Sequence, residues 1–358
     1  MPNISFTNRT FQIKLKNFIS LLFELVRGCP QGSILAPILF SLFYNGVGSS
    51  IFSNFYWLFA DDLSFYCFNS NLADLIKELH RILESLDVWC NERDLIINFK
   101  KTKCLFISKS NIGQLETLPK LQCRGEDIEF VSEFKYLGIM FDSSLSFHRH
   151  WENVCGRVSS SVGCIMLLKR FINIQIFKSL INSFIMSHID YGLIIWGTIS
   201  DSLINVLQSK INSILGAFFY PQLINKYQKL NRIAHSVENL KFQKFSIDYM
   251  ELHEKCNLLS VKERITYFYA IFAYRSIRFD WIPDLKVKFK FGQSQRNQTL
   301  LVPSHHSTFF TKSPIFQSIL VWNKIPSEAK QSDLSLPKFT KLINQWLLNQ
   351  RLVEFVSA

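Results

Sequence analysis

Two adjacent carboxylates, Asp61 and Asp62, stand in the middle of a mostly apolar run, "NFYWLFADDLSFYCF", which spans residues 54–68. Apolar and aromatic residues flank the pair on both sides. This pattern predicts a β-hairpin with two buried arms and the carboxylates at its tip. Aspartate is also a common turn residue because its side chain bonds its own backbone, so the pair alone leaves a purely structural role open.

The charges of this pair restrict the chemistry that it can support. Neighbouring carboxylates repel each other and raise each other's pKa unless a cation lies between them. A hard divalent cation, Mg²⁺ or Mn²⁺, is the usual partner of such oxygen ligands. In two-metal phosphoryl transfer, ions about 3.5–4 Å apart stabilise the attacking and leaving oxygens. Asp61 and Asp62 are therefore candidate catalytic and metal-binding residues.

Hydrophobic periodicity predicts the elements around the pair. Apolar residues at spacings of three and four predict a helix over Leu72–Trp89. Ser33 is expected to cap an earlier helix whose first turn contains Pro37. Strand-like composition is found in three further stretches: "FQIKLKNF", "DLIINFKKTKCLFIS" and "FKYLGIMFD". The last of these, Phe134–Asp142, is expected to be one short strand with a glycine inside it.

Three regions follow from these patterns. Residues 1–142 mix strands and helices, which predicts an α+β unit, and residues 143–220 carry mainly helical patterns. Residues 221–358 form a basic, mainly helical region: between residues 226 and 300 there are 14 Lys or Arg against 7 Asp or Glu. The net charge of +12 favours a polyanionic partner such as nucleic acid, although an anionic membrane surface would also satisfy it.

The sequence argues against two other classes. No uninterrupted apolar run reaches the roughly eighteen residues that a membrane-spanning helix needs, so we expect no membrane insertion. The 8 cysteines form no Cys-x-x-Cys pair, which predicts free thiols in a reducing compartment.

Four stretches follow one another in the order and approximate spacing of the palm motifs of reverse transcriptases: "CPQGSILAPILFSLFYN", "FADD", "LIINFKKTK" and "FKYLGIMFD". The chain most resembles the enzymes of non-LTR (LINE-type) retrotransposons of the jockey-like kind. The likeness continues through "LSFHRHWENV", "HIDYGLIIWG" and "VWNKIPSEAKQSDLSLPKFTKLI". It implies a partial polymerase palm, with an antiparallel sheet and packed helices over residues 1–142, a helical thumb over 143–220, and a retroelement C-terminal region over 221–358.

The resemblance assigns a role to each matching residue. Asp61 and Asp62 match the family's metal-binding aspartates, which hold Mg²⁺ against the incoming nucleotide and the primer 3′ end. Lys101 matches the lysine that protonates the leaving pyrophosphate. A solvated turn formed by Lys100, Lys101 and Lys103 is the alternative interpretation.

Two further motifs match binding segments of the family. The residues that match the segment lining the nucleotide pocket and touching the template are Gln31, Gly32 and Ser33. Those that match the primer grip are Tyr136, Leu137 and Gly138, although a plain buried strand is the alternative there. The implied partners are an RNA template, a DNA primer and deoxynucleoside triphosphates, and the implied location is intracellular, in the nucleus or a cytoplasmic ribonucleoprotein.

The first 60 residues depart from the family pattern. A palm of this kind also needs an earlier strand with another metal-binding aspartate, yet Glu24 is the only acidic residue before Asp61. We therefore expect a C-terminal fragment that lacks this strand and the fingers, with little or no polymerase activity alone and with a separately encoded N-terminal part as one way to complete it. The alternative is a non-catalytic module that binds RNA or an RNA/DNA duplex.

Overall fold

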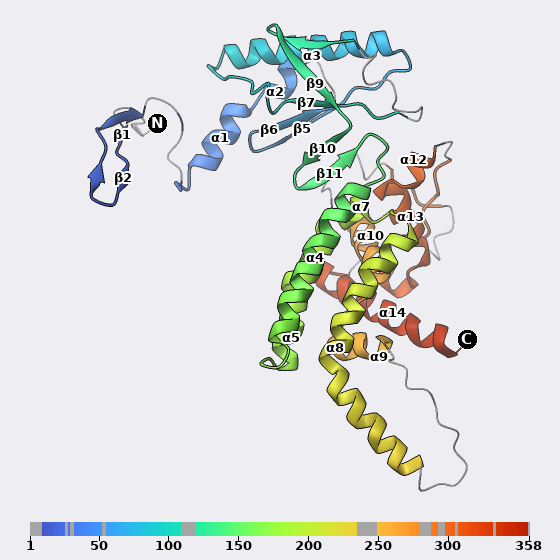
Figure 1. Ribbon diagram of the computed structural model, residues 1–358. Helices are drawn as coiled ribbons and strands as arrows, with labels where there is room; N and C mark the ends of the chain where they lie inside the picture. The colour runs from blue at the N-terminus through green and yellow to red at the C-terminus, as the bar shows by residue number, and fades with distance from the viewer. Residues whose placement is uncertain are drawn as a thin grey trace. The chain divides into compact units, whose positions relative to one another are not determined.

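The computed structural model describes most of the chain. The described residues are 9–25, 28, 32–51, 55–108, 119–234, 249–279, 288–292, 298–304, 307–331 and 334–356. The chain divides into two compact units, and Figure 1 shows their helices and strands. The N-terminal unit comprises Met1–Phe106 and Ser110–Val131, and the C-terminal unit comprises Ile107–Lys109 and Ser132–Ala358. Both mix helices with small sheets, whereas the domain boundaries after residues 142 and 220 stay predictions.

A two-stranded ribbon opens the N-terminal unit. It pairs β1 (Arg9–Phe11) with β4 (Phe23–Leu25) and β2 (Lys14–Leu15) with β3 (Phe18–Ile19), all antiparallel. The stretch expected to be one strand, "FQIKLKNF", therefore turns back on itself at Lys16, which has a φ of 54°. Phe11 and Phe23 stack across the ribbon with their ring centroids 5.5 Å apart.

Two helices and a hairpin form the middle of this unit. The elements are α1 (Ala36–Tyr44), α2 (Val47–Ser50), β5 (Tyr56–Phe59), β6 (Asp62–Phe65) and α3 (Leu72–Asn91). The predicted helix over Leu72–Trp89 is confirmed, and Asn71 caps it by accepting hydrogen bonds from the next turn. Ser33 accepts a hydrogen bond from the Leu35 amide, but the N-cap position of α1 is Leu35, two residues later than predicted.

A three-stranded sheet completes the N-terminal unit. Its strands are β7 (Lys103–Leu105), β8 (Leu121–Cys123) and β9 (Glu126–Val131), in the order β7-β9-β8. The β8–β9 pair is antiparallel, but β7 and β9 run parallel, so the prediction of an antiparallel sheet is wrong for this pair. Only three residues of the strand-like stretch 94–108 form a strand, because residues 98–102 close a turn on Asn98.

The C-terminal unit begins with a β-hairpin where we predicted one strand. β10 (Glu133–Tyr136) and β11 (Ile139–Asp142) pair antiparallel, with Tyr136 opposite Ile139. The two residues between them, Leu137 and Gly138, have φ angles of 44° and 84°. Positive φ at both central residues is the signature of a tight hairpin turn, which is why the glycine reverses the chain here.

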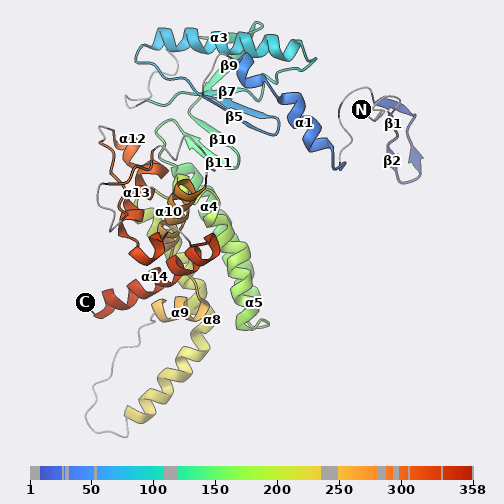
Figure 2. The same ribbon diagram turned by 180° about the vertical axis from the view of Figure 1, so that it is seen from behind.

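Helices form the rest of this unit, in two packed groups. The first contains α4 (His148–Leu168), α5 (Ile174–Leu180), a π-helical turn (Ile181–Met186), α6 (Ser187–Asp190), α7 (Leu193–Trp196), α8 (Asp201–Ala234) and α9 (Tyr249–Cys256). In both views α4 and α8 lie side by side (Figures 1 and 2), and their buried residues share one hydrophobic cluster.

The second group surrounds Trp322 and Phe339, both of which have no exposed surface. Its elements are α10 (Val261–Arg278), α12 (Thr308–Thr311), α13 (Pro314–Lys324), a 3₁₀ turn (Ser327–Lys330) and α14 (Leu336–Val356). Among the described helices, none is both long enough and apolar enough to span a bilayer.

Candidate active site

The carboxylate pair lies where the sequence predicts it, at the tip of the β5–β6 hairpin. Phe59 pairs with Asp62, so Ala60 and Asp61 form a two-residue turn. Ala60 adopts a φ of 52°, in the left-handed region that residues with a Cβ rarely adopt. Both aspartates are exposed, which leaves their oxygens accessible to a ligand.

One face of this hairpin anchors it to the unit. The side chains of Leu58, Leu63 and Phe65 pack against a cluster that contains the buried Ile51 and Trp89. The opposite face is exposed, so the prediction of two fully buried arms is wrong. Aromatic rings stack along that face: Phe55 and Trp57 lie 4.7 and 5.4 Å from Tyr66 between centroids. The packing of the anchoring apolar face and the backbone pairing of Phe59 with Asp62 hold the tip in place.

Helix α1 brings a phenol to the pair. Burial raises the pKa of Tyr44, and the nearby Cys90 and Asp61 raise it further by repelling the phenolate. Tyr44 packs against Trp89, with ring centroids 5.7 Å apart. The end of the motif "ILAPILFSLFYN" is therefore close enough to Asp61 to interact with its charge, and no sequence pattern had assigned a role to Tyr44.

The ligand set at the tip is small. Within the described residues, no group of three or more His, Cys, Asp or Glu side chains is arranged to hold a metal ion. The tip thus offers two carboxylates, which are hard oxygen donors of the kind that Mg²⁺ and Mn²⁺ bind. Two such residues fit a divalent cation chemically but leave most of its coordination to other ligands.

The predicted nucleotide-binding segment is described in part. Gln31 lies outside the described residues. Gly32 has a φ of 84°, and apart from its chain neighbours no atom of the described residues would lie within 4 Å of a Cβ added there, so its backbone is open to a ligand on the described side. Ser33 bonds the Leu35 amide at 3.3 Å through its hydroxyl, which places it in the turn that starts α1.

The lysines of the third motif differ from one another. Lys101 is exposed in the turn closed by Asn98, and no described residue forms an ion pair with it. Lys103 belongs instead to β7, where its ammonium lies 2.5 Å from a carboxylate oxygen of Glu129 on the parallel strand β9. The predicted general acid, Lys101, is therefore an accessible cation, as is Lys100, and this exposure is equally what a solvated turn would show.

The predicted primer-grip residues belong to the C-terminal unit. Tyr136 ends β10, and Leu137 and Gly138 form the hairpin tip. The Tyr191 hydroxyl, from the segment after α6, donates a hydrogen bond of 2.6 Å to the Leu137 carbonyl oxygen. Sequence reasoning noted "HIDYGLIIWG" only as part of a family likeness and missed this contact, because 54 residues separate the two partners.

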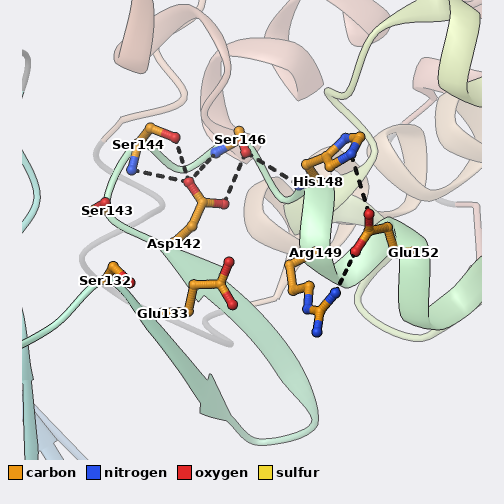
Figure 3. A pocket seen from close by; sticks show the side chains of 9 residues that line it. All are labelled: Ser132, Glu133, Asp142, Ser143, Ser144, Ser146, His148, Arg149 and Glu152. Atoms are coloured by element: carbon orange, nitrogen blue, oxygen red, sulfur yellow. Dashed lines mark hydrogen bonds and ion pairs between the residues drawn. The ribbon is translucent and has the colours of Figure 1, made fainter. Parts of the chain in front are cut away.

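Asp142 closes the base of the same hairpin. Figure 3 shows its carboxylate accepting hydrogen bonds from Ser144 and Ser146, and it also accepts one of 2.7 Å from the Phe147 amide. Burial alone would raise the pKa of Asp142, but the bonds from these three residues outweigh burial and lower it. Asp142 therefore joins the hairpin to the start of α4.

The same pocket in Figure 3, which Ser132, Glu133 and Ser143 also line, contains an ion-pair group on the first turns of α4. Arg149 and His148 both approach the carboxylate of Glu152, at 2.8 and 3.6 Å. Because Arg149 and His148 both approach this carboxylate and Asp142 accepts hydrogen bonds at the start of α4, several polar groups of the pocket are already paired within the chain. We assign it a structural role.

His150 links α4 to both the hairpin and Trp196. Its Nδ1 accepts a hydrogen bond of 3.3 Å from the Met140 amide, and its ring meets the Trp196 ring edge-on at 5.4 Å. Burial lowers the pKa of His150, and the positive charges of Arg157 and Lys135 lower it further. The imidazole is therefore held neutral in the folded unit.

The comparisons with known proteins agree with the motif pattern. Residues 6–141 match the family model described as reverse transcriptase (RNA-dependent DNA polymerase). This match includes both predicted metal ligands and the predicted primer-grip residues. No solved structure matches the chain.

Curated relatives extend the likeness beyond that stretch. The RNA-directed DNA polymerase from mobile element jockey of Drosophila melanogaster is 24% identical over 252 residues, which is 65% of this chain and 27% of that protein. The probable RNA-directed DNA polymerase from transposon BS of the same species is 24% identical over a stretch that covers 64% of this chain and 27% of that protein. A retrovirus-related Pol polyprotein from type-1 retrotransposable element R1 of Bradysia coprophila is 27% identical over a stretch that covers 41% of this chain and 15% of that protein. The matched stretches thus cover well under a third of these relatives.

Proposed function

Because residues 6–141 belong to the reverse transcriptase family, we propose that this chain is part of an RNA-directed DNA polymerase of a non-LTR retrotransposon. The observation that carries the proposal is the pair of exposed carboxylates fixed at the tip of the β5–β6 hairpin, inside the matched residues. The proposed substrates are deoxynucleoside triphosphates, a DNA primer and an RNA template. The proposed location is intracellular, in the nucleus or a cytoplasmic ribonucleoprotein.

In this proposal Asp61 and Asp62 hold Mg²⁺ or Mn²⁺. When bound, the cation supplies stabilisation of the negative charge that develops on the attacking and leaving oxygens. The chain contributes a rigid position for the carboxylates, because the apolar face of the hairpin packs on α3 and α2. The half-buried Tyr44 of α1 lies near enough to Asp61 to interact with its charge.

Three further groups act on substrate in this scheme. Lys101, an exposed ammonium without a described ion-pair partner, delivers a proton to the leaving pyrophosphate. The open backbone at Gly32, with Gln31 and Ser33, lines the nucleotide and template site. The tip of the β10–β11 hairpin, Tyr136 to Gly138, holds the primer end.

We further propose that the isolated chain extends primers poorly. Among the described residues the metal site has two carboxylates and no third ligand, so two bound cations would be under-coordinated. A separately encoded N-terminal part that supplies another carboxylate would restore extension. The second candidate function rests on the same observation: a module that binds RNA or an RNA/DNA duplex without catalysis.

Cation binding at the tip is the direct test. Titration of the purified chain with Mn²⁺, followed by electron paramagnetic resonance, should show a site that Asp61→Asn and Asp62→Asn each weaken by at least about tenfold. Asp74→Asn is the matched control, because Asp74 is an exposed aspartate of the same unit whose side chain pairs with Lys77 on α3. Equal Mn²⁺ affinity in all four proteins would contradict the proposed metal site.

Primer extension separates the two functions. A homopolymer RNA template with a paired DNA primer, labelled nucleotides and Mg²⁺ or Mn²⁺ should yield little product from this chain alone. Clear extension that disappears in Asp61→Ala would show catalysis and contradict the proposed inactivity. Binding of the same primer–template should weaken steeply as salt rises, since phosphate contacts release counterions. Weak binding even at low salt would contradict both functions.

A further inference from the structure

The tip of the β10–β11 hairpin has a backbone conformation that its own sequence does not favour. Leu137 has a φ of 44°, a left-handed value at which a Cβ approaches the following backbone closely. Gly138 continues the turn at a φ of 84°, where glycine is unstrained. A turn with leucine at its first central position therefore depends on contacts from outside the hairpin.

Tyr191 supplies these contacts. Its hydroxyl donates the 2.6 Å hydrogen bond to the Leu137 carbonyl, and its ring lies against the glycine. A Cβ added to Gly138 would lie 3.0 Å from Cε1 of Tyr191, closer than ordinary van der Waals contact. The ring and hydroxyl of one side chain thus meet both residues of the turn, while the Tyr191 side chain itself stays 55% exposed.

The segment that carries Tyr191 is itself rigidly held. The buried Trp196 donates a hydrogen bond of 2.9 Å from Nε1 to the Tyr191 carbonyl. The preceding residue, Asp190, accepts two hydrogen bonds from Arg264 of α10, one of them 2.6 Å from Nε. On the other side, Gly192 lies so close to Ile139 of β11 that a Cβ there would come within 2.4 Å of its Cδ1.

We infer that Tyr191 is a positioning residue that holds Leu137 and Gly138 in the conformation that binds the 3′ end of a DNA primer paired with RNA. The inference rests on the proposed function, which gives the hairpin tip its ligand. The structural half is independent of that function: removing the hydroxyl should let the turn leave its left-handed conformation. Only molecules with an ordered hairpin tip can bind the primer end. The apparent affinity for the primer–template therefore falls in proportion to the fraction of molecules in which the tip stays ordered.

The test compares two variants that lose the same kind of bond. Tyr191→Phe removes the hydrogen bond to the Leu137 carbonyl and keeps the ring. Tyr274→Phe is the matched control, because the Tyr274 hydroxyl donates to the carbonyl of Leu334 in the second helical group. Three properties are measured for each full-length variant and for the wild type: hydrogen exchange of the peptide containing residues 136–142, affinity for a primer–template, and affinity for single-stranded RNA.

In Tyr191→Phe we expect exchange at the hairpin to accelerate and primer–template affinity to fall about fivefold, the effect of losing one hydrogen bond. Affinity for single-stranded RNA should be unchanged, because this RNA offers no primer end. A general loss of folding, in contrast, would lower the affinity for the primer–template and for single-stranded RNA alike. Tyr274→Phe should match the wild type in all three. Unchanged exchange, or unchanged primer–template affinity, in Tyr191→Phe overturns the inference. If the wild type fails to bind the primer–template, the proposed function falls, and the exchange result alone decides whether Tyr191 orders the tip.

Discussion

The two units bury their apolar side chains to different extents. In the N-terminal unit many large apolar side chains are exposed, including Leu15, Phe18 and Leu21 on the ribbon and Ile34 before α1, which is 91% exposed. The C-terminal unit also exposes some, such as Phe171 at 84%, but it buries many more in two clusters that draw on three or more helices each. Buried apolar area is the main source of folding free energy, so the C-terminal unit carries most of the stability. The candidate metal ligands are on the less stable unit.

A tryptophan in each unit gives the sharpest contrast. Trp196 is fully buried, contacts His150 and bonds the Tyr191 carbonyl, whereas Trp57 is 55% exposed on the β5–β6 hairpin. We expect Trp196→Ala to lower the free energy of unfolding of the C-terminal unit by about 4 kcal/mol, since it leaves a cavity and an unpaired carbonyl. Trp57→Ala should cost less than about 1 kcal/mol.

Urea unfolding followed by circular dichroism measures both changes. The comparison needs the wild-type transition of each unit as its baseline, because two units of different stability unfold in separate steps. A cost for Trp57→Ala as large as that for Trp196→Ala would show that the hairpin's aromatic face is buried in solution and would remove the contrast between the units.

The same contrast explains which parts of the fold the sequence predicts. The helix over residues 72–91 was predictable because its apolar period acts locally, and residues 143–220 were predictably helical for the same reason. The β10–β11 hairpin was not, because a leucine at the first turn position hides the turn signal that Gly138 carries. The parallel pairing of β7 with β9 joins residues 26 positions apart, and no local pattern specifies such a partner.

A second comparison concerns acids. Asp142 in the C-terminal unit accepts five hydrogen bonds at the start of α4, whereas Asp62 in the N-terminal unit is exposed. We expect Asp142→Ala to lower the free energy of unfolding by about 2 kcal/mol, because it removes the charged acceptor of these hydrogen bonds. Asp62→Ala should change stability by less than about 0.5 kcal/mol while weakening Mn²⁺ binding.

Urea midpoints and the Mn²⁺ titration separate these outcomes. A stability loss in Asp62→Ala equal to that in Asp142→Ala would make the carboxylate pair a structural turn, the alternative that the sequence leaves open. The sequence alone identifies Asp61 and Asp62 as candidates because charges are rare in apolar runs. It does not distinguish them from Asp142, whose hydrogen bonds come from Ser144, Ser146 and Phe147 only once the chain has folded.

Acid should act first on the C-terminal unit through His150. Burial and the charges of Arg157 and Lys135 lower the pKa of His150 below its unfolded value of 6.5. A lowered pKa means that the folded unit resists protonation, so this contribution to stability is complete above pH 6.5 and is lost as pH falls through the folded pKa. The thermal midpoint should therefore decrease by a few degrees as pH falls below 6.5.

The variant His150→Gln tests this assignment, with His148→Gln as the control. His148 lies two residues away on α4 with an exposed side chain paired to Glu152. The midpoint of His150→Gln should depend less on pH between 7.5 and 5 than that of the wild type or of His148→Gln. An identical dependence in all three proteins would assign the acid sensitivity to another group. Asp142, whose lowered pKa lies under its ordinary 3.8, contributes its own loss only at lower pH.

The smallest expected change in stability is on the ribbon of the N-terminal unit. Phe18 is 69% exposed beside the tip of the ribbon, and Phe11 stacks on Phe23 near its base. Phe18→Thr keeps a residue that suits a strand and removes an exposed ring, so the free energy of unfolding should change by less than about 0.5 kcal/mol. The concentration at which the protein begins to aggregate, measured by light scattering, should rise because an exposed apolar strand edge favours association.

Phe177→Thr is the opposing control, since Phe177 is fully buried in the C-terminal unit and its replacement should both destabilise and aggregate the protein. If Phe18→Thr destabilises the protein as Phe177→Thr does, the ribbon is packed in solution, and the two units differ less in buried apolar surface than the structure indicates.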